Sequence, residues 1–150
     1  MIDRFNDLPL EVRKQIQLWL CTEAIRVWER HCEKNPAMAY VETVCGTRQV
    51  VDVSLPAAAL RCVIEGKDVE KVKSRYGEPI AAMQDEGLVF PDEVTFAYYA
   101  IYNLFGRHVL GRAIDDWLIA NQALSAQGTQ ANFRVMLGAA FAAAGVDSDD

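Results

Sequence analysis

Two histidines are the residues of this chain best suited to acid–base or metal chemistry at neutral pH. His31 is followed by Cys32 and Glu33, but neighbours along a helix point in different directions and do not converge on one ligand. His108 has no HExxH or paired ExxH pattern around it. The sequence therefore predicts neither a catalytic histidine nor a metal centre, and we expect His31 to be a partly buried residue near a helix end.

Asp115 and Asp116 are adjacent carboxylates inside a helical pattern. Successive residues are about 100° apart around a helix, so the two side chains do not readily face one metal ion. We expect one of them to bond a neighbouring helix terminus and the other to be solvated. Asn121 and Gln122 follow on the same helix, where their amides are expected to pair with backbone or cross-helix polar groups.

The four cysteines lie far apart, and no CxxC pair exists. Buried, reduced thiols of a cytoplasmic protein are the expected state, although a zinc site of unusual arrangement stays open. The sequence has no glycine-rich phosphate loop, no GxSxG elbow and no cofactor fingerprint. We therefore expect no cofactor, and an enzymatic function has no support from motifs.

The net charge of −6 is unevenly distributed over the 150 residues. Residues 78–106 contain no Lys or Arg and carry five acids: Glu78, Asp85, Glu86, Asp92 and Glu93. Nucleic-acid binding is disfavoured, because it needs clustered basic residues, whereas a basic partner protein is favoured. The alternative is that the charge serves solubility alone. No apolar run approaches the roughly 20 residues of a membrane span, and the N-terminus has no apolar signal core, so a cytoplasmic location is expected.

The chain is expected to form a single all-α domain of about six or seven helices, organised around residues 90–124. Pro91, Asp92 and Glu93 start that stretch, and apolar residues then recur at helical spacing. Gly106 interrupts the pattern, so we predict two helices that meet near it. Shorter helices with glycine stops are predicted at 57–65, 69–76 and 80–86, a long first helix precedes them, and the last helix covers 130–144. Residues 37–44 could form a short helix, and the β-branched residues 49–55 could form a short strand or an extended link. Because a single strand has no evident partner elsewhere, residues 36–53 are interpreted as a loop or distorted helical turn. The tail 145–150 is expected to fray.

Three tyrosines follow one another closely on the central helix. Tyr98 and Tyr102 are four residues apart and share a face, whereas Tyr99 turns away from it. An outward tyrosine is a plausible interface anchor, although core packing explains the same residues. The predicted partner-binding residues are Asp85, Glu86, Asp92, Glu93 and Tyr99.

The segments FPDEVTFAYYAIYNLF (90–105) and DDWLIANQALS (115–125) carry a resemblance. Together with the rest of residues 59–125, they are similar in character to small helical immunity proteins of bacterial polymorphic-toxin and type VI secretion systems. The resemblance implies a general role: tight binding of a cognate toxin that has a basic surface, with occlusion of the toxin's active site.

Two other functions stay open at this point. The chain could be a small helical enzyme or ligand-binding domain, with a pocket between the first and the central helices. It could also be an adaptor that uses its first helix in a larger assembly, in which case Trp19 or Trp28 would be exposed in the isolated protein.

Overall fold

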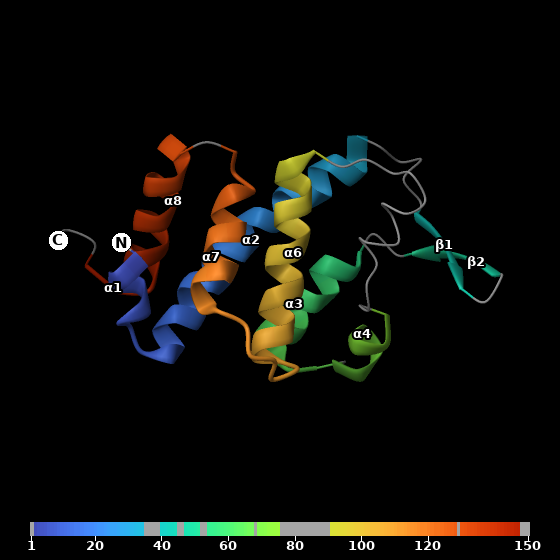
Figure 1. The fold of residues 1–150 in the computed structure, drawn as a ribbon, viewed down its shortest axis with the longest axis horizontal. Helices are drawn as coiled ribbons and strands as arrows, with labels where there is room; N and C mark the ends of the chain where they lie inside the picture. The colour runs from blue at the N-terminus through green and yellow to red at the C-terminus, as the bar shows by residue number, and fades with distance from the viewer. Residues whose placement is uncertain are drawn as a thin grey trace.

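The chain folds into a helical bundle, as the sequence predicts, with a two-stranded hairpin beside it (Figure 1). The computed structural model describes residues 2–34, 40–44, 47–51, 54–67, 69–75, 91–128 and 130–147. In these residues the helices are α1 (Ile2–Asn6), α2 (Leu10–Lys34), α3 (Leu55–Glu65), α4 (Val69–Arg75), α6 (Asp92–His108), α7 (Asp116–Ser125) and α8 (Gln130–Ala143). The predicted helix 80–86, Asp85 and Glu86 lie outside the described residues.

Helix α2 is the long element on which the others pack. It has 25 residues, and α6 and α7 lie side by side across it, with α8 at one end of the molecule (Figure 1). Its stripe of buried residues follows helical spacing and consists of Ile16, Gln17, Leu20, Cys21, Ala24, Ile25 and Trp28. Trp28 packs on Tyr98 of α6 with ring centroids 5.1 Å apart. Since Trp28 is 1 % exposed and Trp19 is partly buried, neither supports an adaptor that offers this face of α2.

The predicted break in the central stretch is confirmed, but it lies further along the chain than Gly106. Helix α6 continues to His108, residues 109–115 connect, and α7 begins at Asp116. Asp92 is the first residue of α6 and Pro91 occupies the cap position, with no side-chain cap bond. The chain reverses between the two helices, so α6 and α7 run antiparallel (Figure 1).

Gly106 allows the connection to fold back closely on α6. Its carbonyl accepts a 2.9 Å hydrogen bond from the backbone N–H of Arg112. A Cβ atom at Gly106 would lie 3.0 Å from Cδ1 of Ile114. The absence of a side chain at this position is therefore used for close approach of the connecting segment and not for ending the helix.

The prediction of a loop or helical turn within residues 36–53 is wrong where the structure describes this segment. Strands β1 (Tyr40–Val44) and β2 (Thr47–Val51) pair antiparallel, with Tyr40 opposite Val51 and Val44 opposite Thr47. Both strands are rich in β-branched residues, which favour extended backbone. The partner that β2 seemed to lack is the segment interpreted as a possible short helix, two residues upstream.

The shorter helices follow their predicted signals. Helix α3 ends at Gly66, whose φ of 70° is the left-handed conformation that glycine adopts without strain. Helix α8 ends one residue before the predicted position. Beyond it, Val146 packs on the core, and its N–H donates a 2.9 Å hydrogen bond to the carbonyl of Phe141. Residues 148–150 of the predicted frayed tail lie outside the described residues.

The buried Trp28 ring gives a test of this packing. Trp28→Ala is expected to lower the free energy of unfolding by about 3–5 kcal/mol, because it leaves a cavity against Tyr98. Trp19→Ala is the control on the same helix and should cost less, since Trp19 is only partly buried. Urea unfolding followed by circular dichroism measures both, and equal losses would contradict the packing.

Candidate functional site

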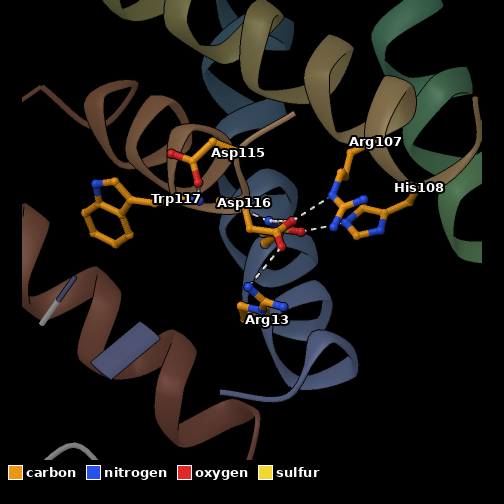
Figure 2. Close-up of polar contacts among 7 residues, drawn as sticks. Arg13, Arg107, His108, Asp115, Asp116 and Trp117 are labelled. Atoms are coloured by element: carbon orange, nitrogen blue, oxygen red, sulfur yellow. Dashed lines mark hydrogen bonds and ion pairs between the residues drawn. The ribbon is translucent and has the colours of Figure 1, made fainter. Parts of the chain in front are cut away.

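A polar cluster joins α2, α6 and α7 at the point where α7 begins. Asp116, 5 % exposed, is the first residue of α7, and its carboxylate accepts from three side chains (Figure 2). Gln17 Nε2 donates to Asp116 Oδ1 and to its backbone carbonyl, both at 2.9 Å. Arg107 Nε donates to Oδ1 at 3.2 Å, and Arg13 Nη1 lies 3.4 Å from Oδ2. Both carboxylate oxygens are therefore engaged.

The Gln17 amide also determines which ring nitrogen of His108 carries the proton. Its NH₂ group faces two acceptor oxygens of Asp116, so its Oε1 must be the atom that faces His108. The distance from Gln17 Oε1 to His108 Nε2 is 2.6 Å. Since Oε1 is only an acceptor, Nε2 of His108 carries the proton and donates it.

The pKa values of Asp116 and His108 are both lowered, for different reasons. Burial acts to raise the pKa of Asp116, but hydrogen bonds from Gln17 and Arg107 and the charge of Arg13 outweigh it, and the pKa is lowered. Burial lowers the pKa of His108, and Lys14 adds to the effect, while Asp116 opposes it. The cluster is thus a carboxylate and a neutral imidazole at pH 7.

These contacts make the cluster a cross-link between helices. Asp116 is the buried, bonded member of the predicted carboxylate pair. Asp115 is exposed and caps α7, accepting from the backbone N–H of Trp117 at 3.2 Å. The predicted cross-helix pairing of amides is also present, since Asn103 Nδ2 donates to Gln122 Oε1 at 2.8 Å. The assignment of the pair to the centre of a helix was wrong, because α7 starts there.

A surface groove lies at the opposite ends of α6 and α7. It is formed by the first turn of α6, the last turn of α7 and the start of α8, and has a volume of about 350 Å³. Its described lining is Asp92, Glu93, Phe96, Asn121, Leu124, Ser125, Gly128 and Phe133. That lining holds two carboxylates and two phenylalanine rings, with no basic side chain among the described residues. The groove is acidic and partly apolar.

The predicted partner-binding residues are partly brought together by this groove. Asp92 and Glu93 are exposed and line it, whereas Tyr99 lies outside it. Tyr99 follows Asp92 by seven residues, about two turns, and so continues the outward stripe of α6 that also contains Phe96. The ring of Tyr99 is half-buried and meets Tyr98 edge-on at 6.2 Å. The groove is not the pocket expected between the first and central helices, because no described residue of α2 lines it.

Burial keeps two of the described thiols protonated at neutral pH. Cys21, Cys32 and Cys62 form no disulfide among the described residues, and Cys62 Sγ donates a 3.0 Å hydrogen bond to the carbonyl of Lys67. Burial raises the pKa of Cys21, and burial together with the charge of Glu29 raises the pKa of Cys32 to about 11. Protonated thiols are poor nucleophiles and poor metal ligands. Among the described residues, no group of three or more His, Cys, Asp or Glu side chains is placed to hold a metal ion.

The sequence did not predict several residues of the polar cluster and of the groove. Gln17 lies on the apolar stripe of α2 between Ile16 and Leu20, and a polar residue inside such a stripe is the signal that it has a buried partner. Arg107 and Phe133 gave no comparable signal, because their roles depend on how α6, α7 and α8 are docked.

No family model, no curated protein and no solved structure matches the chain. Within the described residues, none of the helices combines the length and the apolar character that crossing a membrane requires.

The cross-link can be tested at its central charge. Asp116→Asn is expected to lower the free energy of unfolding by about 1–3 kcal/mol, because Arg13 and Arg107 lose their common counter-charge. Asp115→Asn is the matched control and should change little, since Asn caps a helix as well as Asp. Chemical denaturation of both variants makes the comparison, and equal effects would show that Asp116 is not the central residue.

His108 predicts a dependence of stability on pH. Its pKa is lowered in the folded protein, so the unfolded chain binds a proton more readily below about pH 6.5. Stability is complete above that value and declines as the pH falls toward 5. The pKa of His31 is also lowered by burial, so His108→Gln should remove part of the slope and His31→Gln another part. Denaturation between pH 5 and 7.5 tests this; an unchanged slope in His108→Gln would refute it.

Proposed function

We propose that this chain is a non-enzymatic binding protein that accepts a basic, partly apolar surface of a partner protein in the α6–α7–α8 groove. The observation that carries the proposal is the groove itself, which brings Asp92 and Glu93 together with Phe96. Phe96 is 39 % exposed, so it offers an aromatic surface beside the two carboxylates. Acidic and aromatic groups side by side are suited to recognising a cationic surface with an apolar centre.

The groove favours a cation, although the N-termini of α6 and α8, which carry partial positive charge, lie beside it. Acidic residues in the first turn of α6 also stabilise that helix, which is a reason for their presence without any partner. Each helix end carries only about half a unit charge. The C-terminal end of α7 offsets one N-terminus, so the two carboxylates leave an excess of negative charge.

The polar cluster supports a role without catalysis. His108, Gln17 and Asp116 are bonded in series, whereas in a catalytic triad the histidine bonds the carboxylate directly. Here Gln17 stands between the imidazole and the carboxylate, and Asp116 is neutralised by Arg13 and Arg107. These side chains bond one another and so hold α2, α6 and α7 together.

The most concrete form of the proposal is an immunity protein that acts in the bacterial cytoplasm. Its partner would be a toxin whose active site lies in a cationic cleft, as suits an anionic substrate. Occupation of that cleft by the acidic groove would exclude substrate. This form takes up the resemblance in character proposed from the sequence of residues 59–125, a segment in which α6 and α7 lie.

The test begins with capture of the partner by the tagged protein from its native host and identification by mass spectrometry. Asp92→Asn with Glu93→Gln should then slow association with the captured partner by about tenfold or more at low salt, because electrostatic steering is lost. The variant should fold normally, since both side chains are exposed. The matched control is Glu65→Gln with Glu70→Gln, which removes the same charge from exposed sites on α3 and α4.

Unchanged affinity in the Asp92–Glu93 double variant would remove this surface from consideration. If no stoichiometric partner is captured and the melting temperature rises with a metabolite instead, the protein is a small-molecule-binding domain.

A further inference from the structure

We propose that the partner inserts an arginine side chain into the groove, with the guanidinium held between the Glu93 carboxylate and the phenylalanine rings. This inference rests on the proposed function and names the chemistry of the recognised residue. It commits to arginine over lysine, a distinction that net charge alone does not make.

The position of Glu93 is the first part of the argument. Its side chain reaches from α6 to the turn that follows α7, where a Cβ added to Gly128 would meet both Cγ and Oε1 of Glu93 at 3.9 Å. Gly128 has a φ of 95°, a conformation that disfavours any other residue. The carboxylate therefore lies next to the Gly128 turn, where a Cβ would only reach ordinary contact distance, and glycine is favoured there by its φ.

The aromatic groups are the second part. Phe96 comes from α6 and Phe133 from α8, so the two rings belong to different helices of the groove. Phe133 is held edge-on to Trp117 at 6.2 Å, whereas Phe96 is exposed. A planar guanidinium stacks on aromatic rings while its fork of donors bonds a carboxylate. A lysine ammonium is compact and strongly hydrated, and gains less from such a surface.

The polar groups and the size of the groove agree with this occupant. Asn121 and Ser125 add acceptor oxygens beside the carboxylates, and arginine brings five N–H donors against three for lysine. A volume of about 350 Å³ is at the small end of the roughly 300–1,000 Å³ found for ligand pockets. The groove thus suits a long side chain, with the partner's backbone outside.

The experiment titrates the intact protein with N-acetyl-arginine amide and, separately, with N-acetyl-lysine amide, followed by NMR of the backbone amides. Arginine amide is expected to shift the signals of Ser125 and Gly128 and to bind about two- to fivefold more tightly than lysine amide, the effect of an exposed cation–π contact. Glu93→Gln should weaken both compounds. Phe96→Leu keeps an apolar group but loses one of the two rings, so it should reduce the preference for arginine over lysine.

The outcomes separate this inference from the proposed function. Equal binding of the two compounds, or shifts confined to residues away from the groove, would overturn the arginine assignment. The partner capture and the Asp92–Glu93 variant could still succeed in that case, because they require only negative charge. Conversely, arginine selectivity with an unaffected partner would retain the groove chemistry and reject the partner interface. A Glu65→Gln control that weakens binding would also count against the site.

Discussion

The arrangement of the bundle depends on one buried charge, the carboxylate of Asp116. Asp116 is the first residue of α7. Its carboxylate accepts a hydrogen bond from Gln17 of α2 and forms ion pairs with Arg13 of α2 and Arg107 of α6. A carboxylate removed from water is tolerated only where hydrogen bonds and opposite charges replace its hydration, so the three helices have little choice of register there. The Gly106 contact with the connecting segment tightens the same corner. Since α6 and α7 are antiparallel, a fixed register at this end also determines how their other ends meet.

The helical fold could be predicted because its signals are local. The stripe on α2, the glycine after α3 and the interrupted pattern near Gly106 each depend on a few neighbouring residues. The hairpin could not be found by the same reasoning, because a strand is recognised through its partner, and both strands are short. The end of α6 at His108 was misplaced for a related reason: Gly106 is explained by Ile114 in space and not by its neighbours in sequence.

The candidate site was predictable only in part. Asp92 and Glu93 stood out through the absence of basic residues around them, and the structure places both in the groove. Their apolar companions did not stand out, since nothing in the sequence distinguishes Phe96, which is exposed, from Phe105, which is 1 % exposed, before the helices are packed. Tyr99 was selected for turning away from its neighbours, and it extends the outward stripe of α6 without lining the groove.

The groove is built from three helix ends that lie as much as 41 residues apart in the sequence, from Asp92 to Phe133. None of these ends presents a complete site alone, and the turn at Gly128 comes under Glu93 only when α6, α7 and α8 are docked together. The groove therefore exists only in the folded bundle. A partner of the kind proposed would bind the native state and not the unfolded chain, so its binding would raise the stability of the whole bundle.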